Sequence, residues 1–302
     1  MRVAALDLGS NTFLLLIANV SPQGVVEKIL CDEVRVTRLA EGVNQTKKLS
    51  TQALDRAEKC FQEYSKIIDK YQVEKTQAVA TSAARDASNS EKFFELAKKY
   101  NIPVEIIAGD KEAELTFHGA VGGSPEQGTV VIDIGGGSTE IIGISNNKVK
   151  GFSLNIGSVR LTEMFISNHP TPTSELNELQ SYVKNQLEHN KVHLPSNANK
   201  IIAVAGTPTT LAALDLQQGF SAKDIEGYSL SKDKLESWLN RLSQLSLEER
   251  LLLKGMERGR EDVIIAGLSI LKITTEFFCA DSITVSTKGV RYGLASKLGS
   301  GQ

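Results

Sequence analysis

Apolar residues in the first half of the chain form short runs that predict an opening meander of strands. Helical spacing then starts at Ser50, which suits the N-cap of a long helix with Leu54, Phe61 and Ile68 on one face. The elements expected in this half are strands at 2–7, 13–20, 25–31, 76–80 and 104–108, and helices at 50–71, 90–100 and from 111 onward. Strands that alternate with helices in this way are typical of an α/β fold with mixed or parallel sheets.

The second half opens with the same pattern of apolar runs. Strands are expected at 129–133, 139–144, 148–154, 201–205 and 282–286, and helices at 158–165, 174–187, 209–216, 231–252, 260–278 and 290–298. Between the halves, residues 119–128 contain four glycines and one proline, a composition that indicates a boundary. We therefore predict two domains, 1–122 and 123–302, with a terminal helix near 289–299 that is free to pack back on the first domain.

One short motif occurs twice along the chain. Residues 6–12 read LDLGSNT and residues 132–138 read IDIGGGS, and in both copies an apolar strand ends in an Asp before a turn and a second strand. Asp and Gly are common in turns, so a coincidence is one interpretation. Because both copies begin similar meanders, we favour a duplication, and two similar lobes facing each other would place both turns across one cleft.

The two turns have the composition of phosphate-binding turns. Glycine lets the backbone approach an anion closely, and successive amides in a tight turn form an anion-binding concavity, to which Ser10, Thr12 and Ser138 add hydroxyls. Asp7 and Asp133 would repel phosphate unless a hard cation lies between them, and Mg²⁺ suits that position. Either turn alone is best interpreted as an ordinary hairpin, whereas two matched copies favour phosphate binding.

Two further carboxylates and one arginine are candidates for chemistry. Glu112 follows a strand end and a glycine, where a carboxylate can act as a general base, although the helix macrodipole alone also favours a glutamate there. Glu140 lies on a strand predicted to be buried and therefore needs a cation or an arginine beside it. Arg85 follows a strand end and offers a fork of donors matched to phosphate, although a solvated surface arginine is the default interpretation.

The segment around Gly206 and Thr207 reads as a strand, a glycine and a helix start, which suits an anion at the helix N-terminus. It is not a Walker loop, because no Gly-Lys-Ser/Thr follows the strand. The histidines show no metal-ligand spacing, and no Gly-x-Ser-x-Gly elbow indicates a serine nucleophile. The glycine turns and the carboxylates are therefore the main candidates.

Composition narrows the class of protein. The 34 Lys and Arg against 36 Asp and Glu leave a formal charge of −2, which argues against electrostatic binding of nucleic acid. The three cysteines are widely spaced and predict neither a disulfide framework nor a structural zinc site. No apolar run reaches the roughly 20 residues of a membrane span, and the apolar N-terminus lacks a cleavage site, so we expect a cytoplasmic protein without membrane contact.

Several short motifs follow one another along the chain. They are DLGSNT at 7–12, RLAEG at 38–42, TSAAR at 81–85, GxxEA at 109–113, DIGGGSTE at 133–140, GT at 206–207, REDVIIAG at 260–267 and SxxGVRxG at 286–293. Together they resemble the exopolyphosphatase/guanosine pentaphosphate phosphohydrolase family over residues 3–298. The resemblance implies an α/β fold of the actin, sugar-kinase and heat-shock-ATPase superfamily, with two duplicated ribonuclease-H-like lobes and a central cleft.

The resemblance also assigns roles to residues. Glu112 matches the base that activates water, Asp133 and Glu140 match the carboxylates that hold Mg²⁺, and Arg85 matches an assisting arginine. We expect Asp7 to contribute to the metal site through water. The expected phosphate-binding residues are Ser10, Asn11, Thr12, Gly135, Gly136, Gly137, Ser138, Gly206 and Thr207. Lys111, where an acidic residue is frequent, and Thr287, where Asp is frequent, depart from the family pattern without removing a candidate group.

The predicted function is therefore a magnesium-dependent hydrolase that releases terminal phosphate from polyphosphate, from pppGpp or from both. A phosphotransferase of the same superfamily and a sensor that binds guanosine tetra- or pentaphosphate with little turnover are the alternatives. A homodimer is among the assemblies that the sequence allows.

Overall fold

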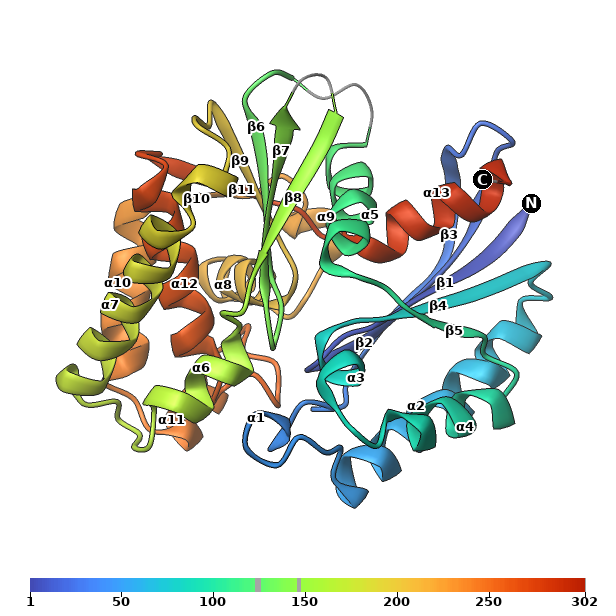
Figure 1. Ribbon diagram of the computed structural model, residues 1–302, viewed down its shortest axis with the longest axis horizontal. Helices are drawn as coiled ribbons and strands as arrows, with labels where there is room; N and C mark the ends of the chain where they lie inside the picture. The colour runs from blue at the N-terminus through green and yellow to red at the C-terminus, as the bar shows by residue number, and fades with distance from the viewer. Residues whose placement is uncertain (123–125, 146–147, 302) are drawn as a thin grey trace. The chain divides into compact units, whose positions relative to one another are not determined.

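The computed structural model describes residues 1–122, 126–145 and 148–301 (Figure 1). The chain forms two compact units, the first made of Met1–Gly119 with Lys288–Gln302 and the second of Ala120–Thr287. Of the glycine-rich stretch predicted as the boundary, residues 123–125 lie outside the described residues. Within the described part of the chain, no helix is long and apolar enough to cross a membrane.

The first unit contains one mixed sheet and the helices that cover it. Its elements are β1 (Arg2–Leu8), β2 (Thr12–Val20), β3 (Val26–Val36), α1 (Val43–Thr46), α2 (Thr51–Lys70), β4 (Lys75–Ala80), α3 (Ser82–Asp86), α4 (Ser90–Lys99), β5 (Val104–Ile106), α5 (Gly109–Val121) and α13 (Val290–Ser300). The strand order is β3-β2-β1-β4-β5, with β1, β4 and β5 parallel and β2 and β3 antiparallel. The predicted N-cap is confirmed, because the Ser50 side chain accepts a hydrogen bond from the Ala53 amide at the start of α2.

The two faces of this sheet are covered by different helices. Figure 1 shows α2 and α4 on one side of the sheet and α13 on the other. Toward α2 and α4, the rings of Phe13, Phe61 and Phe93 pack with centroids 5.3–6.0 Å apart. On the opposite face, Val3 and Ala5 of β1 join the apolar residues of α13 in one cluster. The last helix is therefore part of the core of the first unit.

The second unit is larger and contains one sheet of six strands. Its elements are β6 (Thr129–Ile134), β7 (Thr139–Ser145), β8 (Lys148–Leu154), α6 (Ser158–Phe165), α7 (Thr173–His189), η1 (Lys191–His193), β9 (Lys200–Val204), α8 (Gly206–Asp215), α9 (Ala222–Ile225), β10 (Ser229–Ser231), α10 (Lys232–Ser243), α11 (Leu247–Leu251), α12 (Ile264–Phe277) and β11 (Ser282–Val285). The strand order is β10-β11-β9-β6-β7-β8, with β6, β9 and β11 parallel.

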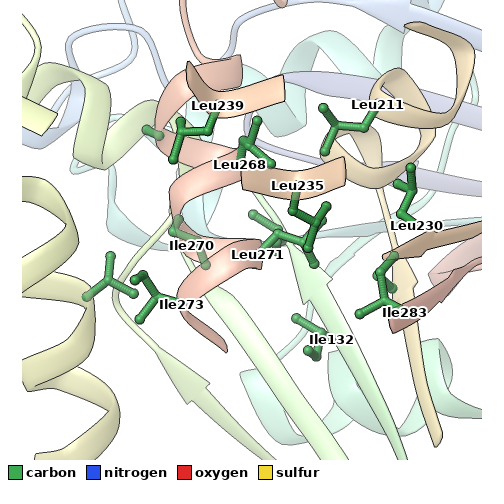
Figure 2. Close-up of a cluster of buried hydrophobic side chains, with 14 of the residues drawn as sticks. Ile132, Leu211, Leu230, Leu235, Leu239, Leu268, Ile270, Leu271, Ile273 and Ile283 are labelled. Carbon is green, nitrogen blue, oxygen red and sulfur yellow. The ribbon is translucent and has the colours of Figure 1, made fainter. Parts of the chain in front are cut away.

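Helix α12 forms the centre of the core of the second unit. Leu268, Ile270 and Leu271 of this helix are fully buried and contact residues of α10 and of the sheet (Figure 2). Every residue of α12 from Ile264 to Leu271 is buried, so this part of the helix is enclosed by its neighbours. This core supports the strand ends on which the candidate residues lie.

The two units repeat one topology. In each, an antiparallel meander (β1-β2-β3 or β6-β7-β8) borders parallel strands (β4 and β5, or β9 and β11). The turns between the first two strands also match, since Gly9 donates its amide to the Thr12 carbonyl at 3.1 Å and Gly135 donates to Ser138 at 3.0 Å. The predicted duplication and α/β fold class are confirmed.

The structure differs from the predicted elements mainly at short segments. Helices α1, α3 and α9, strand β10 and the turn η1 were not predicted, and β3 continues to Val36. Residues 260–263, predicted as helical, precede the start of α12 at Ile264. Elements of three to five residues are too short to show a helix or strand period, so hydrophobic spacing does not reveal them.

Candidate functional site

The parallel strands of the first unit end at one edge of their sheet, where several candidate residues gather. β1 is parallel to β4, and β4 is parallel to β5, so the segments that follow them lie at the same edge. Ser10, after β1, shares a 2.8 Å hydrogen bond with Ser82, after β4, and both side chains are buried. This contact ties the first glycine turn to the neighbouring strand end.

The peptide groups of the first turn have a defined direction. The carbonyl of Ser10 accepts a hydrogen bond from the Ala40 amide at 2.8 Å, and the carbonyl of Asn11 accepts from Thr37 and Arg38 at 2.9 Å each. In a planar trans peptide, the carbonyl and the following amide point in opposite directions. The amides of Asn11 and of the residue after it are therefore directed away from the 37–40 segment.

The second turn has the same arrangement, with the first turn of α6 in the place of the 37–40 segment. The Gly135 carbonyl accepts from the Ser158 amide at 2.9 Å, and the Gly136 carbonyl accepts from Val159 and Arg160 at 2.9 and 3.0 Å. The helix N-terminus thus uses the carbonyls of the turn as its caps.

These bonds direct the amides of the second turn away from α6. The Gly137 carbonyl also accepts a hydrogen bond, from Arg160 Nε at 2.7 Å. Because three successive carbonyls face α6, the amides of Gly136, Gly137 and Ser138 point to the opposite side. Successive amides directed to one side form an anion-binding concavity, which is the geometry that a phosphate oxygen requires.

Asp133 and Glu140 lie side by side on the second sheet. They are register partners on the antiparallel strands β6 and β7, and both are buried, with 8% and 1% of their surface exposed. Partners in this position have Cβ atoms about 4.5–5.5 Å apart, and two carboxylates so placed repel each other. Ser153, the register partner of Glu140 on β8, donates a 2.6 Å hydrogen bond to Glu140 Oε1.

This pair of carboxylates fits a magnesium ion. Mg²⁺ prefers oxygen ligands and is commonly bound by one or two carboxylates together with phosphate oxygens and water. Among the residues that the structure describes, no group of three or more His, Cys, Asp or Glu forms a candidate metal cage. The donor set is therefore suited to an ion that keeps water and substrate oxygens as ligands.

The first unit lacks this carboxylate pair at the matching position. Asp7 occupies the place of Asp133, but its register partners are Leu14 on β2 and Val79 on β4. The two copies therefore share the turn but differ in the residue opposite the Asp on the next strand, which is Leu14 in the first copy and Glu140 in the second. The second copy thus places two carboxylates across adjacent strands.

Glu112 and Arg85 lie at the end of β5 in the first unit. Glu112 is in the first turn of α5, where its amide donates to Ala108 at 3.0 Å, and its side chain is buried, with 7% exposed. Arg85, in the last turn of α3, donates from Nη1 to the Ile107 carbonyl at 3.3 Å. The structure thus brings the predicted base and the predicted arginine to the same strand end.

A further arginine lies beside Gly206 in the second unit. A Cβ atom at Gly206 would lie 1.6 Å from Arg260 Nη1, so the guanidinium occupies the space that a side chain would fill at the first residue of α8. Ala205, which precedes it, has φ 73° and ψ −166°, a region normally restricted to glycine, so strain is concentrated at this junction. Sequence reasoning placed Arg260 in a motif but gave it no role, because no local pattern shows that its side chain lies beside Gly206, 54 positions earlier in the chain.

Another carboxylate, which sequence reasoning did not select, directly follows α9 and contacts the residues after β11. Glu226 accepts hydrogen bonds from the Ser286 hydroxyl at 3.2 Å and from the Thr287 amide and hydroxyl at 2.8 Å. β11 is parallel to β9, so this group lies at the same sheet edge as Gly206. Thr287, one of the departures from the family pattern, is thus a donor to Glu226.

Arg291, from α13, is buried against the first sheet. It donates two hydrogen bonds to Asp32 at 3.0 and 3.1 Å, and Tyr292 donates to the same carboxylate at 3.2 Å. Burial opposes the charge of Arg291, but the Asp32 carboxylate outweighs it and raises the pKa of the guanidinium. The pair fixes the N-terminal end of α13 on the sheet face that also carries Asp7.

The candidate residues therefore form one set in each unit. The first unit brings together Asp7, Ser10, Asn11, Thr12, Arg85 and Glu112 at the ends of β1, β4 and β5. The second brings together Asp133, Gly135, Gly136, Gly137, Ser138, Glu140, Gly206 and Thr207 at the ends of β6 and β9 and the start of β7. Each set combines directed amides with at least one buried carboxylate.

Comparison with known proteins identifies the class. The chain consists of two α/β units that repeat one strand topology, each with a glycine turn after its first strand. Residues 16–299 match the model of the Ppx/GppA phosphatase family. The chain therefore belongs to the Ppx/GppA phosphatase family, a class of hydrolases, and the predicted resemblance is confirmed.

Individual relatives match along their whole length. Exopolyphosphatase 2 of Mycobacterium tuberculosis is 36% identical over 317 residues, covering 98% of each chain. The crystal structure of the Aquifex aeolicus Ppx/GppA family member is 34% identical, with a TM-score of 0.80 and coverage of 99% of this chain and 97% of that one. An exopolyphosphatase structure from Cytophaga hutchinsonii is 27% identical, with a TM-score of 0.88 and coverage of 100% and 98%.

Proposed function

We propose that this protein is a magnesium-dependent phosphoanhydride hydrolase that releases terminal phosphate from inorganic polyphosphate, from pppGpp or from both. The observation that carries the proposal is the matched direction of the amides in the two glycine turns. Family membership supports a phosphatase, and the exopolyphosphatase names of the relatives support a substrate with a chain of phosphates.

In the proposed reaction, water attacks the terminal phosphorus and Glu112 takes its proton. A new P–O bond forms, the anhydride P–O bond breaks, and the shortened chain leaves with the bridging oxygen. The catalytic effect comes from positioning and from stabilising negative charge rather than from covalent chemistry with the protein.

Other residues of the two sets bind and orient the substrate. The amides of Asn11, Gly136, Gly137 and Ser138 donate to phosphate oxygens, and Arg85 adds a charged donor. Gly206 and Thr207 offer the N-terminus of α8 to a further phosphate group. Polyphosphate would thus be held by backbone donors and a few charges, which agrees with a net charge of only −2.

Asp133 and Glu140 would hold Mg²⁺, and Asp7 would contribute to the metal site through water. When bound, Mg²⁺ neutralises part of the charge on the phosphate oxygens. Within the protein, the ion also offsets the repulsion between the two neighbouring carboxylates.

A direct test measures phosphate release from long-chain polyphosphate, tripolyphosphate and pppGpp side by side, with Mg²⁺ and with a chelator. We expect release from at least one substrate, abolished by the chelator. Glu112→Gln should retain the fold and substrate binding and lose most turnover. Glu114→Gln, two residues along α5 and 48% exposed beside Lys111, is the matched control and should keep wild-type turnover.

The alternatives give different results in the same assay. Transfer of phosphate to an acceptor, with none released to water, would indicate a phosphotransferase. Tight binding of guanosine tetra- or pentaphosphate with no release over hours would indicate a sensor. Near-full activity of Glu112→Gln would remove Glu112 from the role of base.

A further inference from the structure

The segment between β3 and α1 determines the direction of the first glycine turn. Thr37, Arg38 and Ala40 donate their amides to the carbonyls of Asn11 and Ser10. This segment lies outside the sheet and outside any helix, so its own position must be fixed by other contacts. Arg38 has φ 49°, in the left-handed region that a non-glycine residue adopts only when neighbouring groups hold it there.

Arg56, on α2, holds that segment from the other side. Its Nε donates to the Thr37 carbonyl at 2.6 Å, and its Nη2 donates to the Arg38 carbonyl at 3.1 Å and to Glu41 Oε2 at 2.6 Å. The planar guanidinium donates to two successive carbonyls at once. A lysine ammonium is a point charge on a flexible stem and does not reproduce this fixed geometry. Thr37 and Arg38 therefore donate to the turn with their amides and accept from Arg56 with their carbonyls.

Arg56 extends from a helix that is anchored in the core of the first unit. Helix α2 begins with Ser50 as its N-cap. Ala57, next to Arg56 in the sequence, and Phe61, one turn further along, are buried. The side chain of Arg56 is 34% exposed and that of its partner Glu41 is 54% exposed, so the ion pair by itself contributes little to the stability of the fold. The contact fixes the position of a loop rather than adding to the core.

We propose that Arg56 is a positioning residue: it fixes the Thr37–Glu41 segment so that the turn at Ser10–Thr12 presents its amides to a phosphate group of the substrate. The inference rests on the proposed function, since it assumes that this turn binds phosphate. It extends that function to a residue that lies outside both candidate sets and that acts through its contacts with the loop.

The test compares Arg56→Ala and Arg56→Lys with a matched control, Arg35→Ala. Arg35, on β3, forms ion pairs with Glu33 on the same strand and with Glu63 on α2, whereas the side-chain contacts of Arg56 are with the Thr37–Glu41 segment. The measurements are kcat and KM for tripolyphosphate with Mg²⁺, binding of tripolyphosphate by calorimetry, and hydrogen exchange of the amides of residues 37–40. Glu41→Gln, which keeps both carbonyl contacts of Arg56, is a second variant.

We expect Arg56→Ala to weaken tripolyphosphate binding and to lower kcat/KM by about tenfold or more, the effect of losing one well-aligned hydrogen bond to a charged group. Hydrogen exchange at 37–40 should accelerate, Arg56→Lys should recover only part of the loss, and Arg35→Ala and Glu41→Gln should stay within about twofold of wild type.

The outcomes separate this inference from the proposed function. Wild-type binding and kcat/KM in folded Arg56→Ala, or an equal loss in Arg35→Ala, would overturn the positioning role while leaving the hydrolase intact. If the wild-type protein binds tripolyphosphate but releases phosphate from none of tripolyphosphate, long-chain polyphosphate and pppGpp, the hydrolase proposal fails, and weaker binding by Arg56→Ala still supports the positioning role. If the wild-type protein neither binds nor cleaves any of these three substrates, both proposals fail.

Discussion

Gly157 offers a direct test of whether α6 orients the second glycine turn. A Cβ atom at this position would lie 2.4 Å from the Gly136 carbonyl oxygen and 2.5 Å from the carbonyl carbons of Gly136 and Gly137. These are backbone atoms, so the clash cannot be relieved by a change of rotamer. Gly157 has φ −144° and ψ 160°, an extended conformation that alanine adopts freely, so the effect of Gly157→Ala comes from contact alone.

The expected magnitude follows from the bonds that must move. Separating the turn from α6 lengthens the hydrogen bonds from Ser158, Val159 and Arg160 to the carbonyls of Gly135 and Gly136. Overpacking of a close contact costs about 1–3 kcal/mol of stability. Rotating the peptide groups also misdirects at least one amide, and a hydrogen bond to a charged group is worth about 1.5–3 kcal/mol. At tenfold per 1.36 kcal/mol, kcat/KM should fall about ten- to 150-fold.

The assay pairs urea unfolding with phosphate release from tripolyphosphate. Gly219→Ala is the control, because a Cβ atom at Gly219 meets nothing within 4 Å, and it carries the same change in the entropy of the unfolded chain. We expect Gly219→Ala to match wild type in kcat/KM. A folded Gly157→Ala protein with kcat/KM within about twofold of wild type would refute the view that the contact with α6 directs the amides of the turn.

Three further predictions concern charge. Glu140→Gln should raise the Mg²⁺ concentration needed for half-maximal phosphate release at least tenfold. It should also reduce the increase in Tm that Mg²⁺ gives the wild-type protein. An unchanged Mg²⁺ titration would exclude Glu140 as a ligand. Asp32→Ala leaves Arg291 buried without its carboxylate and should lower the free energy of unfolding by about 3–5 kcal/mol in urea, whereas a loss below about 1 kcal/mol would contradict the importance of the pair. Burial and the nearby Arg250 lower the pKa of His169, so the unfolded chain binds a proton more readily as pH falls through about 6.5. Stability should therefore fall between pH 7 and pH 5, with a smaller slope in His169→Gln, and equal slopes would show that His169 does not contribute.

Much of the fold follows from local sequence signals. The repeated Asp-apolar-Gly turn predicts two matched hairpins, and Ser50 predicts the start of α2, because strand periodicity, turn composition and capping all act within a few residues. The strand ends at Asp7 and Asp133 follow from the same signals. Local rules therefore predict where the candidate turns begin.

The rest of the site depends on contacts between distant segments. Arg260 reaches Gly206, and Arg56 reaches the loop beyond β3, through side-chain geometry that no local pattern specifies. The register of β7 against β6 places Glu140 beside Asp133, whereas the register of β2 against β1 places Leu14 beside Asp7. The sequence shows that the turns are alike, and only strand pairing shows that their neighbours differ.

Helix α13 has a consequence for the order in which the two units are completed during synthesis. Val290, Leu294 and Leu298 belong to the apolar cluster that covers β1, so the first unit lacks one side of its core until these residues have been made. The second unit is continuous in sequence, from Ala120 to Thr287, and its core needs no later segment. The ribosome thus begins the first unit earliest and finishes it last, with the second unit free to fold in the interval.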